Sequence, residues 1–222
     1  SVYHGDALPI RERTRAGDPK LAAAWANTTW NQTAVHAPEA DHPAESGFAN
    51  HLIHELVEEG FDIAVSDALR EEVGVGHAFS FLYQYIMPEL EIPVVPVTLN
   101  AFYPPNQPTP RRAFQLGEGV RNAIDSWAPD KKVAVMASGG LSHFIIDEEL
   151  DHMLLEGLRT RDEESLANIP RDLLIELATT ESLNWIALSG AMTGEQMTLV
   201  DYVPCYRTPA GTGCAMAFAY WE

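Results

Sequence analysis

The sequence is short of basic residues, and this shortage excludes several kinds of partner. It has 14 Lys and Arg against 32 Asp and Glu, which gives a formal net charge of -18. A field of this sign repels phosphate backbones and anionic membrane surfaces. The basic runs Arg11–Arg15 and Arg111–Arg112 are too short to overcome it. We therefore expect small-molecule partners, with no nucleic acid and no membrane among them.

Long apolar runs and cysteines are also scarce. No run reaches the roughly 18 to 20 residues that span a bilayer, and the N-terminus lacks the basic and then apolar profile of a signal peptide. We expect the two cysteines, Cys205 and Cys214, to be free thiols, because a chain of 222 residues can bury a core without disulfides. A soluble, cytoplasmic protein is the expectation that follows.

From Gly47 onward, short β-rich runs alternate with amphipathic stretches. This pattern predicts a single α/β domain with helices flanking a mostly parallel or mixed central sheet. Residues 1–46 contain no complete βα unit, so we expect an incomplete or irregular N-terminal part followed by the α/β domain at 47–222. The expected helices are Phe48–Gly60, about sixteen residues ending near Trp127, and most of Asp147–Met192. The expected strands are Phe61–Val65, Ile92–Leu99, Lys132–Ala137, Met197–Val203 and Cys214–Trp221.

A polar turn follows Lys132–Ala137, the run that best fits a buried strand. Ligands bind beyond the carboxyl ends of strands in open α/β sheets, and Ser138–His143 lies at such an end. Its two glycines permit a tight turn or a close approach of the backbone to a ligand. A histidine held there suits proton transfer near neutral pH. Taken alone, a histidine after a strand is more often an ordinary loop residue, but the surrounding six residues change that balance.

The turn Ser-Gly-Gly-Leu-Ser-His-Phe resembles the active-site turn of the class III extradiol dioxygenases, of the protocatechuate 4,5-dioxygenase catalytic-subunit type. The resemblance covers about residues 47–222, and its segments occur in the family's order. The other matching segments are Gly74–Phe79, Val97–Ala101, Pro110–Arg112 with Leu116-Gly, Thr180–Trp185 leading into Ser189–Met192, and Thr212-Gly213.

This resemblance implies an oxidoreductase of aromatic catabolism, which uses Fe(II) and O2 to open a catechol-type ring beside its diol. His143 is then the general base that removes a phenolic proton, and His77 is a partner acid or a hydrogen-bonding group for the substrate. Ser142, Gly140 and Thr212 are the candidate substrate-binding residues. We also expect a homo-oligomer.

The implied iron site needs two histidines and one carboxylate on one face of the metal. Glu181 is the candidate carboxylate. The two histidine ligands are not identifiable, because His4, His36 and His42 lack the flanking strands of the family's Ser-His and Asp-His segments. Either those segments precede Ser1, which we prefer, or this relative has lost the metal.

Two rival functions remain open. A metal-free binding or scaffold relative is favoured by the unidentified ligands and opposed by the pair His77 and His143. A zinc-dependent hydrolase or lyase on a related scaffold would keep Glu181 and cleave no ring. Metal analysis of the full-length protein separates the three readings, because they predict iron, no metal and zinc respectively.

Overall fold

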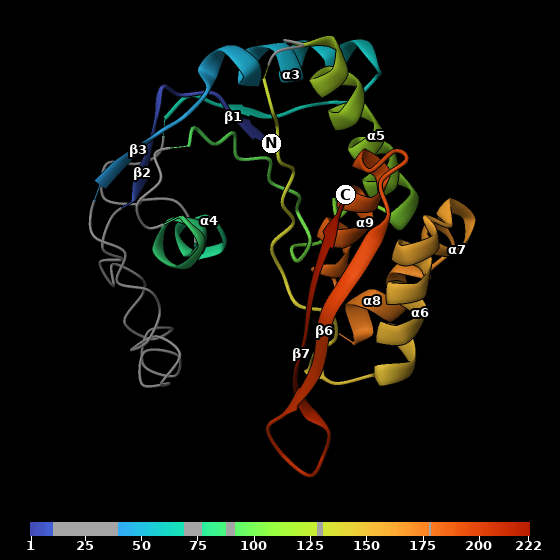
Figure 1. The fold of residues 1–222 in the computed structure, drawn as a ribbon. Coiled ribbons are helices and arrows are strands. Elements are labelled where there is room, and N and C mark those ends of the chain that lie inside the picture. Colours follow the sequence, from blue (N-terminus) through green and yellow to red (C-terminus); the bar gives the residue numbers. More distant parts are fainter. Residues whose placement is uncertain (11–39, 69–76, 88–91, 128–130, 178) are drawn as a thin grey trace. The chain divides into compact units, whose positions relative to one another are not determined.

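The computed structural model describes residues 1–10, 40–68, 77–87, 92–127, 131–177 and 179–222 (Figure 1). The chain forms two compact units. Unit 1 comprises Ser1–Ile53 and Ile63–Val97, and unit 2 comprises His54–Asp62 and Thr98–Glu222. No helix of the described segments is long and apolar enough to cross a membrane. The division predicted between residues 1–46 and 47–222 rests on the absence of a complete βα unit from the first part, and it stays a prediction.

Unit 1 combines two small sheets with short helices. Its strands form one parallel pair, β1 with β4, and one antiparallel pair, β2 with β3. A small apolar cluster of Leu8, Tyr83 and Met87 lies in this unit. The elements are β1 (Val2–Tyr3), β2 (Ala7–Ile10), β3 (Ala40–Pro43), β4 (Val65–Ser66), α4 (His77–Phe81) and the π-helix η1 (Leu82–Ile86); α3 (Ser46–Glu58) begins here and ends in unit 2.

Unit 2 contains the main hydrophobic core and an antiparallel sheet in the order β5-β7-β6. Thr109 accepts a hydrogen bond from the Arg112 N–H and Pro110 follows it, so α5 starts with a capped end. The elements are α5 (Pro110–Ser126), β5 (His143–Ile145), α6 (Glu148–Thr160), α7 (Glu163–Ala167), α8 (Arg171–Glu176), α9 (Ser182–Ala191), β6 (Met197–Tyr206) and β7 (Thr212–Trp221).

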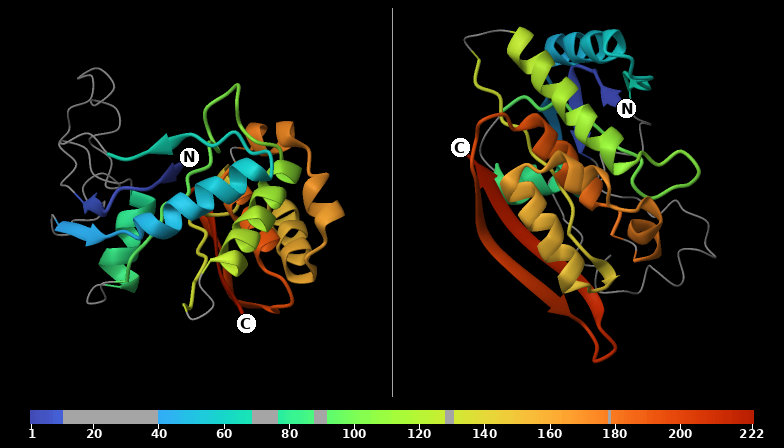
Figure 2. Two further views of the ribbon diagram at one scale, coloured as in Figure 1. Left: turned by 90° about the horizontal axis from the view of Figure 1, so that it is seen from above. Right: turned by 90° about the vertical axis from the view of Figure 1, so that its right-hand side faces the viewer.

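The long β6–β7 hairpin presents two different faces (Figure 2). Gly213, Ala215 and Ala217 of β7 are buried, and the intervening Cys214 and Met216 are only partly so. Alternation of this kind is what one covered and one open face of a sheet require. Helix α6 lies beside β6 and contributes Leu150, Leu154, Leu155 and Leu158 to the core. The open face of β7 therefore carries the cysteine and the methionine.

The predicted α/β class is confirmed, and so are the expected helices and the two C-terminal strands. The strand predicted at Lys132–Ala137 is wrong, because residues 131–140 are irregular and Val133 and Met136 are 42% and 51% exposed. A buried strand needs hydrogen-bonded neighbours, and no described strand pairs with this one. Ile92–Leu99 forms only the single bridge from Val97 to Val2, since Pro93 and Pro96 have no N–H to donate.

Candidate active site

The two glycines of the Ser138–His143 turn lie too close to their neighbours to carry side chains. Gly139 has a φ of 146°, and a Cβ there would lie 2.9 Å from the Cβ of Glu181. A Cβ on Gly140 would collide with Cε1 of the His143 ring and lie 3.0 Å from the Ala215 carbonyl oxygen. Only glycine avoids both problems. The tight turn expected from the sequence is therefore present, and it brings the backbone against Glu181 and His143.

Strand β7 holds this turn on one side. The Leu141 N–H donates to the Ala215 carbonyl over 2.9 Å, and the Ala215 N–H donates to the Ser142 carbonyl over 2.8 Å. Phe144, which follows directly, has a φ of 63°. A bulky residue rarely adopts this left-handed conformation, and such strain persists only where surrounding bonds enforce it.

Helix α9 holds the turn on the other side. The Asn184 side-chain amide donates to the Ser138 carbonyl over 2.8 Å, and the Trp185 indole N–H donates to the Gly139 carbonyl over 2.9 Å. Trp185 is itself a core residue with 5% exposure. Since buried indole groups are rigidly packed, the position of the turn is tied to the core of unit 2.

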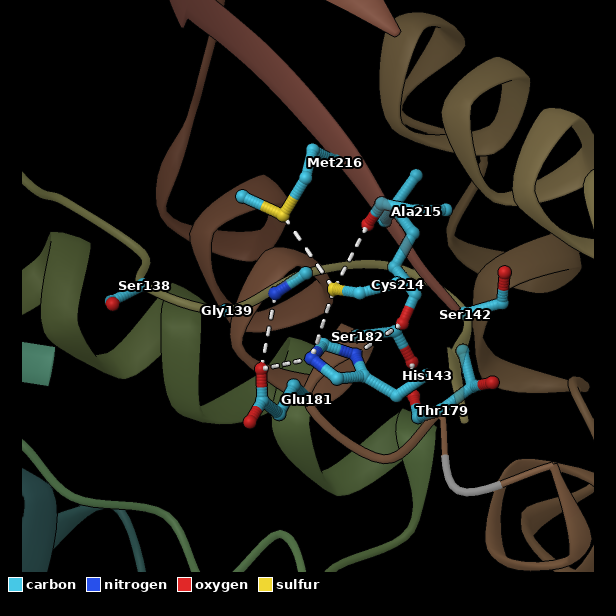
Figure 3. Close-up of polar contacts among 12 residues, drawn as sticks. Ser138, Gly139, Ser142, His143, Thr179, Glu181, Ser182, Cys214, Ala215 and Met216 are labelled. Carbon is cyan, nitrogen blue, oxygen red and sulfur yellow. Dashed lines mark hydrogen bonds and ion pairs between the residues drawn. The ribbon is translucent and has the colours of Figure 1, made fainter. Parts of the chain in front are cut away.

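His143 is the first residue of β5 and lies opposite Cys214 of β7. Its Nδ1 is 3.0 Å from the Leu141 carbonyl oxygen, which can only accept, so Nδ1 carries a hydrogen. In the neutral ring the lone pair is therefore on Nε2. This atom lies 3.3 Å from the Cys214 Sγ and 3.5 Å from the Glu181 Oε2. Figure 3 draws both contacts as dashed lines.

These neighbours favour the charged form of the imidazole. The pKa of His143 is raised from 6.5 to about 9, first by the hydrogen bond with Cys214 and then by the Leu141 carbonyl and the negative charge of Glu181. Partial burial acts in the opposite direction. At neutral pH the ring is therefore an imidazolium, and it can act as a base only after the surrounding charges have been offset.

Glu181 immediately precedes α9 and directs its carboxylate toward the turn. Its Oε2 accepts a hydrogen bond from the Gly140 N–H over 3.0 Å, while its Oε1 has no hydrogen-bond donor among the described residues. The side chain is 45% exposed. An oriented carboxylate with one uncommitted oxygen fits a single hard ligand of a divalent cation. Within the described segments, however, no group of three or more His, Cys, Asp or Glu is arranged to hold a metal ion.

The remaining predicted site residues are distributed as follows. His77 is the first residue of α4 in unit 1, and so belongs to the other compact unit. Ser142 is fully buried, and its hydroxyl donates to Asp151 over 2.7 Å. Thr212 begins β7, and its Oγ1 lies 2.7 Å from the Oγ1 of Thr208. Of the possible histidine ligands, His4 and His42 are in unit 1 and His36 is outside the described residues.

Sequence reasoning missed two residues of this site, Cys214 and Asp151. Cys214 reaches His143 because β5 and β7 pair, and no local pattern indicates that register. The position of Asp151, in contrast, could have been noticed in the sequence. It lies three, four and seven residues before Leu154, Leu155 and Leu158, which places a carboxylate on the apolar stripe of a helix.

The chain belongs to a dioxygenase family. Residues 23–216 match the family described as the catalytic LigB subunit of aromatic ring-opening dioxygenase. The chain is 28% identical over 164 residues to a gallate dioxygenase of Pseudomonas putida, an alignment covering 67% of this chain and 46% of the relative. It is 33% identical over 109 residues to a 2,3-dihydroxyphenylpropionate/2,3-dihydroxicinnamic acid 1,2-dioxygenase of Mycobacterium sp., covering 49% and 32% respectively. The chain thus matches less than half the length of these curated relatives.

Proposed function

We propose that the protein is an extradiol dioxygenase that opens a catechol-type aromatic ring with O2 and depends on Fe(II). The observation that carries this proposal is the placement of the His143 Nε2 at 3.5 Å from the Glu181 Oε2 by one glycine turn. In the proposed reaction, a base and a metal ligand would act side by side, and this short distance supports that assignment. Membership of the ring-opening family and the named substrates of the relatives support it.

In this proposal Glu181 supplies one oxygen ligand, and the two histidine ligands are not among the residues identified above. Bound Fe(II) would orient the diol and deliver electrons to O2, which side chains cannot do. A cation at Glu181 would also cancel the attraction of this carboxylate for a proton on His143. The part of the rise in the pKa of His143 that is due to Glu181 would then be lost, and a larger fraction of the ring would be neutral, while the contributions of Cys214 and the Leu141 carbonyl remain.

The role proposed for His143 is to remove a phenolic proton at Nε2. The Nδ1–H bond to the Leu141 carbonyl keeps the lone pair on Nε2 and fixes the direction in which it points. This arrangement needs no movement of the ring between binding and proton transfer. The proton accepted at Nε2 would then be stabilised by Cys214.

The other site assignments remain proposals. His77 is proposed as the partner acid, and Gly140 and Thr212 as substrate contacts. The Ser142 hydroxyl is bonded to Asp151, so a substrate would have to displace that bond to reach it. We further propose a homo-oligomer located in the cytoplasm, where free thiols such as the two in this chain are usual.

The test is oxygen uptake by the full-length protein reconstituted anaerobically with Fe(II). We expect one O2 consumed per ring opened with at least one of protocatechuate, gallate and 2,3-dihydroxyphenylpropionate. His143→Ala is the matched control, because it should retain iron and lower turnover by about 100- to 10,000-fold. Stoichiometric iron with no uptake across this panel would contradict the proposal. Native protein that contains zinc would instead favour a hydrolase or lyase.

A further inference from the structure

Asp151 of α6 is a fully buried carboxylate that the chemistry proposed above does not use. It lies on the helix face that carries Leu154, Leu155 and Leu158 into the core. Burying a carboxylate is unfavourable unless hydrogen bonds replace its lost hydration. The donors that surround Asp151 therefore indicate what this side chain holds in place.

Two of the three donors to Asp151 come from Ser142, the residue before His143. The Ser142 N–H donates to Oδ1 over 2.8 Å, and the Ser142 hydroxyl donates to Oδ2 over 2.7 Å. The third is the Tyr202 hydroxyl, 2.8 Å from Oδ2. Burial and then this bond to Asp151 raise the pKa of Tyr202, so its phenol remains a donor. The Ser142 hydroxyl oxygen also accepts a hydrogen bond from the Asp147 N–H over 3.0 Å.

These bonds fix the orientation of the chain at Ser142. Its N–H is held by Asp151 of α6, and its carbonyl is held by the Ala215 N–H of β7. With both groups bonded, the backbone at Ser142 cannot turn without leaving a buried polar group unpaired. His143 follows immediately, and its ring bonds back to the Leu141 carbonyl. A rotation at Ser142 would therefore move the imidazole.

We propose that Asp151 is a positioning residue, which acts through Ser142 to hold the His143 ring in the orientation needed for proton transfer. The inference deepens the proposed function and rests on the role given there to His143. It assigns to a carboxylate on α6 a part in the reaction, although Asp151 contacts neither His143 nor Glu181 among the bonds described above.

Two substitutions at Asp151 and one matched control separate positioning from stability alone. Asp151→Asn keeps Oδ1 for the Ser142 N–H, but an amide nitrogen, which donates, replaces Oδ2. The hydroxyls of Ser142 and Tyr202, which donate to Oδ2, must therefore reorient. Asp151→Ala removes all three bonds. Tyr202→Phe is the control, because it removes one bond to the same carboxylate and leaves both bonds to Ser142. A purely structural role predicts that activity follows stability in all three variants.

Steady-state kinetics of the iron-loaded, full-length protein is the first readout. Displacements of about 1 Å in an active site cost about 100-fold in rate. We expect kcat to fall by about 10- to 100-fold in Asp151→Ala and by about 3- to 10-fold in Asp151→Asn, with KM changed less than about threefold. Tyr202→Phe should retain kcat within about twofold, even where its melting temperature falls as far as that of Asp151→Asn.

The ring itself provides the second readout, which does not depend on activity. The spectra are recorded on metal-free protein with 15N-labelled histidine, at a pH above the His143 pKa of about 9, where the ring is neutral. Under these conditions the wild type and Tyr202→Phe should show the single hydrogen on Nδ1 of His143. Asp151→Ala should show a mixture of tautomers. If Asp151→Ala does not fold, Asp151→Asn carries the test with both readouts.

Wild-type kcat together with a wild-type His143 spectrum in Asp151→Asn would overturn the inference. A Tyr202→Phe variant as slow as Asp151→Asn would overturn it too. If the wild type consumes no O2, the proposed function fails, while the imidazole spectra still decide whether Asp151 orients the ring.

Discussion

Replacing Cys214 with alanine tests the electrostatics of the site without relying on catalysis. The hydrogen bond with Cys214 is the largest cause of the raised pKa of His143, which is about 9 against an ordinary value of 6.5. The folded chain therefore binds this proton more tightly than the unfolded chain does. The resulting stabilisation is complete below about pH 6.5, declines as pH rises toward 9 and is absent above it.

The size of this effect can be derived from the pKa difference. A difference between 6.5 and about 9 corresponds to about 3 kcal/mol in the free energy of unfolding. The His143 side chain is only 24% exposed, so solvent screens only part of its interactions with Cys214 and Glu181. A hydrogen bond to a charged group contributes about 1.5 to 3 kcal/mol. We expect Cys214→Ala to remove about half of the pH-dependent stabilisation, since the Leu141 carbonyl and Glu181 remain.

The assay is urea unfolding of the metal-free protein at pH 6 and at pH 9, with an NMR titration of the His143 ring. Cys214→Ala should lower the pKa of His143 and reduce the loss of stability between the two pH values. The packing lost with the thiol does not depend on pH, so it cancels in this comparison. Cys205→Ala is the matched control, because Cys205 is exposed and faces Cys214 across β6 and β7. An unchanged His143 titration in Cys214→Ala would refute the reasoning.

Substitutions at three further positions test other contacts of the site. Glu181→Gln and Glu181→Ala should lower iron occupancy as well as rate, whereas His143→Ala should lower rate alone; iron content equal to the parent would remove Glu181 from the ligand set and make Glu176 the next candidate. Gly140→Ala places a Cβ against the His143 ring and the Ala215 carbonyl, and it should lower the free energy of unfolding by about 1 to 3 kcal/mol. An unchanged urea midpoint would show instead that the turn relaxes around the added methyl group. Asp147→Ala removes the side chain that caps α6 at the Leu150 N–H and should cost about 0.5 to 2 kcal/mol in urea unfolding; an unchanged stability would show that the cap contributes nothing.

The helices were predictable because their signals are local. Thr109 and Pro110 mark the start of α5, and Asp147 marks the start of α6. The strands β6 and β7 were predictable for a similar reason, since a turn-rich segment separates two β-like runs. The run at Lys132–Ala137 has an equally clear local pattern and still forms no strand. A strand depends on partners elsewhere in the chain, and its own residues do not say whether those partners are in place.

The same difference between local and long-range signals applies to the candidate site. The glycine turn was recognisable because adjacent residues, above all Gly139 and Gly140, determine its backbone geometry. The structure shows that a Cβ on either glycine would lie too close to its neighbours. The contacts of His143 could not be inferred in this way. Cys214 is 71 residues away along the chain, and it reaches the ring only through the register of β5 on β7. Sequence separation of this size hides a contact from any local pattern.

The turn that carries His143 is held by three elements, and each fixes a different part of it. Residues at the start of α9 hold the Gly139 carbonyl and the Gly140 N–H. Strand β7 holds the Leu141 N–H and the Ser142 carbonyl, and α6 holds the Ser142 N–H and hydroxyl through Asp151. Substitutions that loosen one element should therefore move the ring without removing any group that touches it. This is why stability measurements alone cannot identify the residues that act in the site, and why kinetics must be paired with a direct observation of the His143 ring.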